Sequence, residues 1–430
     1  MRKLFLFHRI VKTISIYYHT NYKLLFQNER CNIAFNLILP TKNSFMKFFF
    51  RKILVAVLLM CALSSNAQID YPTFKSETVI NAADSERLSF NLYNLNYINN
   101  TEWFGNIPLS GTLFGYQIIP EIEYQISPKL IIKGGLYLQK EFGRPHYTSV
   151  DPTFTVKYKT KHASFLIGTL EGNDNHQFIE PIYDYKLILN ERLENGFQFK
   201  VNTKPYSHDF FINWRVAIHP GDPFKEQFDI GYVSKIHLIN KGKIDLSIPV
   251  QLLYSHKGGQ YDSLSSTPLT SIVNSAVGAS LIYKTDNRLL KRIVFDNYYV
   301  NYKDISGDKI QPFKEGNAYL SHLLFDFKNV GIDLRYWTGS GYIGPRGMAL
   351  FQSVSEKYPG LVEKHRELLI VSFIYDKEIF KNVNFDFRLI PYKDFREKIS
   401  SGTGLEYSYE MYLKYNLKIN IKRIKNSLNN

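Results

Sequence analysis

The C-terminal part of the chain alternates strictly between apolar and polar residues. From Leu405 to Ile421 every odd-numbered residue is apolar, whereas the even-numbered positions are mostly charged or amide side chains. A period of two places these two sets on opposite faces of a β-strand. A strand of this length is unusual in a soluble sheet, but it crosses a bilayer when it is tilted. The segment therefore predicts a wall strand with lipid on one face and water on the other.

The same alternation recurs along the chain, and short connections mostly alternate with long, polar ones. Outer-membrane barrels show this asymmetry because their periplasmic turns are short and their outer loops are long. We expect an all-β fold: a transmembrane antiparallel β-barrel over residues 86–421 with about 16 strands (roughly 14–18). The other alternating segments are 154–159, 197–202, 210–217, 244–255, 330–337 and 383–390.

The strand count depends on residues 172–195. If they form one long loop and Thr203–Ser207 is a periplasmic turn, the count is even and both ends of the barrel lie in the periplasm. If Tyr183–Leu189 is instead a wall strand, the alternation of short and long connections breaks from there on. An even count supports the first interpretation.

Composition agrees with a barrel without requiring one. Aromatic residues make up 15% of the chain, and after residue 67 there is no uninterrupted apolar run of about 18 residues that would predict a transmembrane helix. A soluble β-sandwich has a similar composition. The apolar face of Leu405–Ile421 counts against it, because monomeric soluble proteins rarely expose such a stripe.

The N-terminal region predicts export. From Met46 a basic stretch, an apolar stretch and the small residues Ser65 and Ala67 follow in the order of a secretory signal peptide, with cleavage before Gln68. We expect residues 1–45 to be a misassigned start or an extended leader, 46–67 the signal peptide, 68–85 a periplasmic segment and 422–430 a polar, basic tail. Both cysteines, Cys31 and Cys61, lie before the predicted cleavage site, so the mature chain needs no disulfide and has no thiolate metal ligand.

Net charge does not predict a nucleic-acid partner. The chain carries +14 in total, but ten of its 53 Lys and Arg and only one of its 39 acidic residues precede Gln68, so the remainder is near +5. A nucleic-acid-binding protein would need a dense basic face.

With its signal peptide, alternating strands and turn asymmetry, the mature chain resembles a bacterial outer-membrane porin-type β-barrel, and its Ser-Asn-Ala-Gln junction resembles those of Bacteroidota. The resemblance implies outer-membrane lipid, the barrel assembly machinery and small hydrophilic solutes as partners, and a trimer is possible. The chain departs from this pattern at its end, where Lys422 and Arg423 follow the last strand in place of a terminal aromatic residue.

The densest cluster of possible ligands lies in the long connection 172–195. Asp174, His176 and Glu180 could bind a cation or hydrogen-bond a sugar. In porins of similar layout such a loop narrows the lumen. A plain outer loop is the alternative, because Asn, Asp, Gly and Pro are common loop residues. A metal site is a third interpretation, although we expect neither metal nor cofactor.

Charged residues of both signs occupy the expected water-facing sides of the strands. Among them Arg215, Arg335 and Arg388 are candidates for binding anionic or sugar solutes in the lumen. A mixed lining argues against strong ion selectivity.

The sequence predicts a channel for small hydrophilic solutes and not an enzyme. The histidines are scattered and no Gly-x-Ser-x-Gly nucleophile motif occurs. The alternatives are a non-conducting barrel with a structural, secretion or assembly role and, less favoured, an outer-membrane hydrolase.

Overall fold

The computed structural model describes residues 73–259, 268–396 and 406–424. Within them, sixteen long strands account for the wall and the helical segments are single turns. None of these helices is long and apolar enough to span a membrane. The elements are η1 (Ala82–Asp84), β1 (Arg87–Glu102), β2 (Gly111–Ser127), β3 (Leu130–Glu141), β4 (Ser149–Lys159), β5 (Ala163–Thr169), η2 (Asn173–His176), α4 (Leu187–Asn190), β6 (Asn195–Asn202), β7 (Tyr206–Val216), β8 (Glu226–Lys241), β9 (Ile244–Gly258), β10 (Thr270–Lys284), β11 (Leu290–Asp304), β12 (Glu315–Phe327), β13 (Val330–Ser340), η3 (Ala349–Phe351), β14 (His365–Phe380), β15 (Val383–Asp394) and β16 (Glu406–Arg423).

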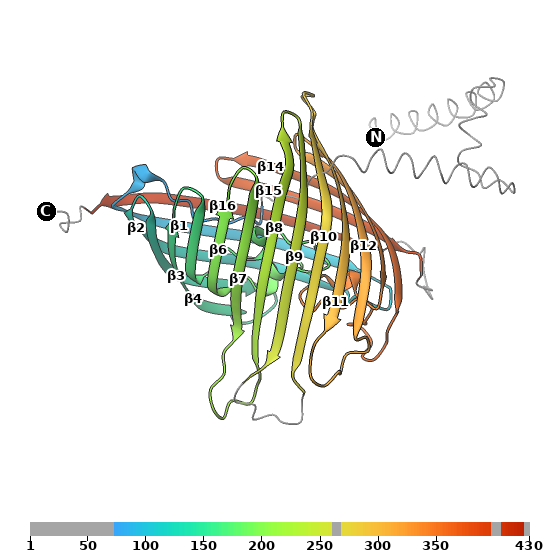
Figure 1. Ribbon diagram of the computed structural model, residues 1–430. Coiled ribbons are helices and arrows are strands. Elements are labelled where there is room, and N and C mark those ends of the chain that lie inside the picture. The colour runs from blue at the N-terminus through green and yellow to red at the C-terminus, as the bar shows by residue number, and fades with distance from the viewer. Residues whose placement is uncertain (1–72, 260–267, 397–405, 425–430) are drawn as a thin grey trace, which may run out of the picture. The chain divides into compact units, whose positions relative to one another are not determined.

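The strands close into one antiparallel barrel. Each strand pairs with its neighbours in sequence, and β1 pairs with β16 to complete the wall, with Tyr93 opposite Asn416. Closure leaves no unpaired sheet edge, which is the condition for a sheet to span a bilayer. Figure 1 shows the long connection after β7 at one end and the tight turns after β8 and β10 at the other. The predicted fold and strand count are confirmed.

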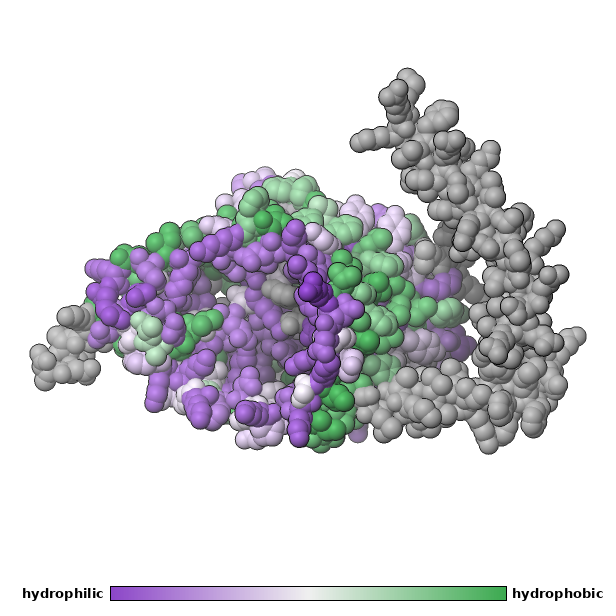
Figure 2. Space-filling model, turned by 90° about the horizontal axis from the view of Figure 1, so that it is seen from above, coloured by the Kyte–Doolittle hydropathy of each residue, from purple (hydrophilic) through white to green (hydrophobic). Residues whose placement is uncertain are grey.

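The wall is apolar outside and polar inside, as the alternation predicts. On β16, Tyr409 and Leu413 are more than a third exposed, whereas Glu406 and Glu410 between and beside them are at most 1% exposed. Seen from above, hydrophilic residues gather around the opening of the barrel and hydrophobic residues cover much of the flank (Figure 2). The strand continues to Arg423, which pairs with Arg87, so the first residues of the expected tail are part of the wall.

Much of the interior of the barrel is filled with protein, and a cavity of about 690 Å³, lined by Asp326, Asp376 and their neighbours, remains near the short turn after β12. Buried aromatic and aliphatic side chains come from the wall and also from two long connections, 170–194 and 341–364, which contribute Ile182, Tyr185, Tyr342 and Phe351 to one continuous core. Residues 183–189 are therefore not a wall strand; they lead into the single turn α4 inside the lumen.

Residues 73–78, part of the segment expected in the periplasm, also lie inside the barrel. Phe74 is 1% exposed and packs edge-on against Tyr412 of β16, with ring centroids 4.8 Å apart. The backbone N–H of Thr78 donates to Glu171 (2.8 Å) and its carbonyl accepts from Lys157 (2.8 Å). These contacts place the segment between the wall and the connection 170–194.

Candidate functional site

The connection 170–194 is bonded to the wall on several sides of the lumen. Tyr185 donates to Glu410 of β16 (2.8 Å), and the backbone N–H of Ile179 donates to Gln251 of β9 (2.9 Å). Gln139 of β3 donates to the carbonyl of Leu189 (2.6 Å). The loop therefore crosses the interior of the barrel and does not project outside it.

His176 is the centre of this loop's polar network. Its Nε2 lies 2.8 Å from Glu194 and its Nδ1 2.9 Å from Asp209 of β7, and the ring stacks on Phe211 at 3.6 Å. Burial alone would lower the pKa of His176, but the carboxylates of Glu194 and Asp209 outweigh it and raise this pKa to about 9. The side chain is therefore a buried imidazolium with both nitrogens occupied, which suits anchoring and does not suit catalysis.

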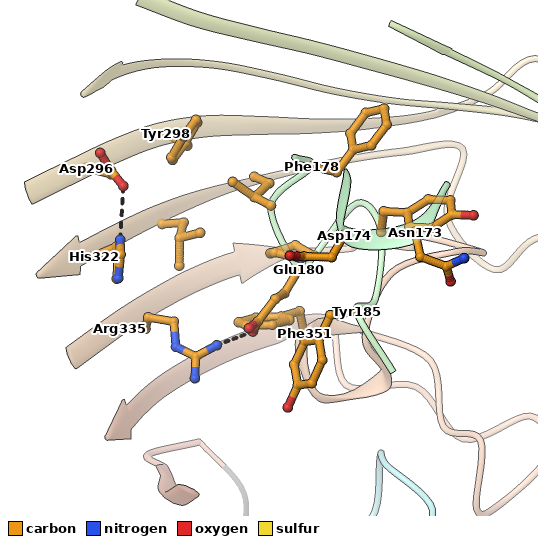
Figure 3. Close-up of a pocket in the computed structure, with 14 residues that line it drawn as sticks. Asn173, Asp174, Phe178, Glu180, Tyr185, Asp296, Tyr298, His322, Arg335 and Phe351 are labelled. Atoms are coloured by element: carbon orange, nitrogen blue, oxygen red, sulfur yellow. Dashed lines mark hydrogen bonds and ion pairs between the residues drawn. The ribbon is translucent and has the colours of Figure 1, made fainter. Parts of the chain in front are cut away.

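Glu180 and Arg335 are brought together across the lumen. Arg335 of β13 forms an ion pair with Glu180 of the loop, and its Nε lies 2.9 Å from Asp333. His322 of β12 lies beside them, with Nδ1 3.0 Å from Asp296. Figure 3 shows both pairs around a small cavity of about 40 Å³. These five charged groups pair with one another and leave little space for a solute.

The remaining predicted residues are separate from that pair. Arg215 of β7 lies 3.1 Å from Glu191 of the connection 170–194 and 3.8 Å from Asp229 of β8. Arg388 pairs with Asp386 at 2.7 Å and lies over the ring of Phe74.

Asp174 is buried in η2 and lines the same cavity as Glu180. Neither His176 nor His322 has a Ser, Thr or Cys side chain among its hydrogen-bond partners in the described ranges. No group of three or more His, Cys, Asp or Glu in those ranges is arranged to hold a metal ion. The interior charges of the described ranges thus pair with one another and hold the loops in place.

A serine and a histidine do meet on the outer surface of the wall. His256 of β9 and Ser271 of β10 are directly opposite one another. His256 is four residues after the outward-facing Leu252 on the same strand, so the side chains of His256 and Ser271 both face outward. Ser271 Oγ lies 2.8 Å from Nδ1 of His256. The hydroxyl of Tyr254 lies 3.2 Å from Ser271 Oγ and 3.3 Å from the same imidazole nitrogen. These three side chains form one hydrogen-bonded cluster.

A carboxylate and a glycine complete the surroundings of the imidazole. Gly258 follows His256 on the same face of β9, and a Cβ placed there would lie only 2.7 Å from Nε2 of His256. Glu226 of β8 is directly opposite Gly258 and interacts electrostatically with His256. The missing side chain thus leaves room for the imidazole, and the charge of Glu226 acts on the ring without a hydrogen bond or ion pair between the two side chains in the described residues.

This arrangement has the parts of a Ser–His–carboxylate set. A neutral imidazole that accepts the Ser271 proton at Nδ1 carries its own proton on Nε2, the side on which Glu226 stabilises positive charge. In the commonest triads Nε2 of the histidine faces the serine, whereas here Nδ1 of His256 faces Ser271. Catalytic sets of this kind are recognised by the geometry and role of their residues. The cluster can therefore activate a hydroxyl for attack on an acyl group.

The cluster lies at the membrane interface on the side of the long connections. Aromatic side chains adjoin it on the outer wall, with Phe228 5.0 Å from His256 and Trp214 5.3 Å from Phe228. A second aromatic group, Tyr206 and His208, lies near the short turn before β7. Aromatic belts of this kind mark the two lipid–water boundaries of membrane proteins, and Ser271 lies beside the group near the long connections.

A family model described as "Lipid A 3'-O-deacylase-type" matches residues 80–424, which include every strand of the barrel. The chain belongs to the lipid A 3'-O-deacylase-type family. Because this is an enzyme family by its description, the expectation that the chain is not an enzyme is wrong. Scattered histidines and the absence of a nucleophile motif misled that expectation, since a wall site draws its residues from neighbouring strands and leaves no local motif.

Several solved outer-membrane proteins are similar to this deacylase-family barrel. OprD of Pseudomonas aeruginosa is 12% identical with a TM-score of 0.46, covering 78% of this chain and 95% of that one. OmpT of Vibrio cholerae, in a trimer form, is 7% identical with a TM-score of 0.46, covering 77% of this chain and 100% of that one. A comparison with curated protein sequences finds no match. At these identities the likeness concerns the fold alone.

The residues of the wall cluster were not predicted from the sequence of this deacylase-family chain. The alternating segment expected at 244–255 stopped just before His256, and Ser271 belonged to no motif. In the structure β9 continues to Gly258. Extending the period of two past Tyr254 would have placed His256 on the lipid face, where a polar side chain needs an explanation.

Proposed function

We propose that the protein is an outer-membrane ester hydrolase that removes a fatty acyl chain from an outer-leaflet glycolipid of the lipid A type. The observation that carries the proposal is the cluster of Glu226, His256 and Ser271 on the lipid-facing wall. Its place at the outer interface matches the depth at which a lipid's ester bonds lie, and the family's description names the same reaction.

Ser271 is the nucleophile in this proposal. Its Oγ attacks the ester carbonyl carbon while its proton passes to Nδ1 of His256, and Glu226 stabilises the imidazolium that forms. His256 then gives the proton to the alcohol oxygen as the ester C–O bond breaks. Water next attacks the acyl-serine, losing its proton to His256, which returns it to Ser271 as the fatty acid leaves.

Passage of small hydrophilic solutes, the function expected from the sequence, has weaker support. The connections 170–194 and 341–364 fill the described lumen with side chains that are largely inaccessible to solvent. A sixteen-stranded barrel is wide enough for an aqueous channel when it is empty, so the filling works against conduction.

The test measures fatty acid release from an acylated, phosphorylated glycolipid in detergent micelles by mass spectrometry. We expect Ser271→Ala and His256→Gln to lower the rate by about a thousandfold or more, in line with the loss of a nucleophile or its base. Ser321→Ala, a change on the same wall face of β12, is the matched control and should be active. Full activity of Ser271→Ala would overturn the proposal.

A further inference from the structure

The outer surface of the wall changes character at Ser271. On the β7–β9 side the neighbouring side chains are aromatic, including Trp214, Phe228 and Tyr254. On the β10–β12 side, beyond Val273 and up to the level of Ser275, the outward side chains are polar. Asn301 and Asn317 are paired in register on β11 and β12, and Lys303 lies one outward-facing position beyond Asn301. The boundary between the two surfaces passes through the proposed nucleophile.

The polar residues are close enough to Ser271 to contact the same molecule. Lys303 is directly opposite Val273, the next outward-facing residue after Ser271 on β10, so Lys303 and Ser271 are diagonal neighbours. Diagonal pairs in antiparallel sheets have Cα atoms about 7–8 Å apart, within reach of a long side chain. Asn301 is opposite Ser275, one step further along β10.

These side chains are available to a ligand. Lys303 and Asn317 are exposed and Asn301 is half-buried. Within the described ranges, none of the three makes a side-chain hydrogen bond or ion pair. Glu315 is opposite Lys303, but on β12, the side away from Ser271. An anion beside Ser271 therefore meets the ammonium group before it meets that carboxylate.

We propose that Asn301, Lys303 and Asn317 form the headgroup subsite of the hydrolase, with Lys303 contacting an anionic group and the amides contacting sugar hydroxyls. The acyl chain to be removed then lies over Phe228 and Trp214. This assignment rests on the proposed function and specifies the orientation of its substrate. An ester joins a polar headgroup to an apolar chain, so a nucleophile at a polar–apolar boundary meets its carbonyl when each part covers its own surface.

The test compares two glycolipids that differ only in phosphate: an acylated, phosphorylated glycolipid and the same lipid after phosphatase treatment. For Lys303→Gln we expect about a tenfold loss of kcat/KM on the phosphorylated lipid, carried mainly by KM, because a charged contact is removed from binding. The dephosphorylated lipid should be hydrolysed equally by both proteins, and Lys303→Arg should recover most of the loss. Lys291→Gln, near the other end of β11, is the control.

A binding measurement separates this proposal from the hydrolase itself. In the Ser271→Ala background, Lys303→Gln should weaken binding of the phosphorylated lipid by about tenfold and leave binding of the dephosphorylated lipid unchanged. An equal loss for both lipids, or no loss, would overturn the headgroup subsite even in an active enzyme. If the native protein releases no fatty acid, the hydrolase fails, and the binding result still decides the subsite. A third lipid, without phosphate but with a carboxylated sugar, tests the other anion. If Lys303→Gln weakens binding of this lipid, the anion that Lys303 contacts is a carboxylate.

Discussion

Replacing His176 should release the loop that fills the lumen. His176 bridges Glu194, which belongs to that loop, and Asp209, which belongs to the wall. His176→Gln keeps a polar side chain of similar size but removes the positive charge between the two carboxylates. Removing one partner of a buried ionic network typically costs about 3–5 kcal/mol because the remaining charges have no counter-ion.

The raised pKa of His176 gives an independent value for the free energy that this network contributes to stability. A move from the ordinary 6.5 to about 9 corresponds to roughly 3 kcal/mol. Because this pKa is raised in the folded state, the stabilisation is complete below about pH 6.5 and is lost as the pH rises through 9. Burial raises the pKa of Asp184 to about 7 despite Lys186 nearby, so that group changes charge at the lower end of this window.

Thiol labelling would measure the opening of the loop. No cysteine follows the predicted cleavage site, and Ile182, which is 0% exposed, is a suitable position for a single one. When closing is faster than labelling, the labelling rate is proportional to the population of the open state. A loss of roughly 3 kcal/mol should therefore speed labelling of Ile182→Cys by about a hundredfold in the His176→Gln background.

The pH dependence supplies the decisive comparison. After correction for thiol ionisation, labelling of the protein with His176 should accelerate as the pH rises from about 6.5 to about 9, whereas the His176→Gln protein should show no such acceleration. His146→Gln, in an exposed connection, should resemble the native protein. Equal labelling rates for the His176→Gln and native proteins would show that the loop is held by other contacts and would refute the reasoning.

Three further changes test the wall, the cluster and the filled lumen. Gly258→Ala should lower ester hydrolysis by about tenfold or more while the barrel stays folded in gel mobility, because its Cβ would displace the imidazole of His256; Gly111→Ala, which meets no atom within 4 Å, is the control. The native protein should show no conductance steps in planar bilayers, and deletion of residues 172–194 should produce them; a native channel would contradict the filled lumen. Leu413→Lys, on the lipid face, should destabilise the barrel by about 2–4 kcal/mol in urea titrations, and a neutral result would place that face in water.

The wall could be predicted from the sequence because its physics is local. Lipid on one side and water on the other impose a period of two on each strand separately, so residues such as Leu413 and Lys414 are assigned without knowing their neighbours. The position of residues 172–195 could not be assigned in this way. Polar loop residues are equally suited to solvent and to a buried network, and the difference lies in partners such as Asp209, which are distant in sequence.

The pairing of charged residues across the lumen could not be predicted from the sequence for the same reason. Arg335 was predicted to face inward, and it does, but its partner Glu180 is far away in the sequence and lies on a different kind of element. The sequence shows that charges of both signs face inward; only the closed barrel shows that they neutralise one another. A mixed lining that would tune ion preference in an open pore instead anchors loops in a filled one.

The wall cluster was missed for a different reason, since every residue in it obeys the period that predicted the strands. A polar side chain on the lipid face costs free energy unless it is hydrogen-bonded, so each departure from the apolar pattern there needs a partner or a role. His256 and Ser271 form a hydrogen bond of 2.8 Å with one another, and that bond explains why these two polar side chains are tolerated on the lipid face of the wall. It does not account for Gly258, which weakens a strand and where an added Cβ would lie 2.4 Å from Leu269 and 2.7 Å from the imidazole. If the hydrogen bond between His256 and Ser271 were only structural, any outward residue that packs beside it could occupy position 258. An imidazole that must remain accessible to a substrate needs the space that only glycine leaves.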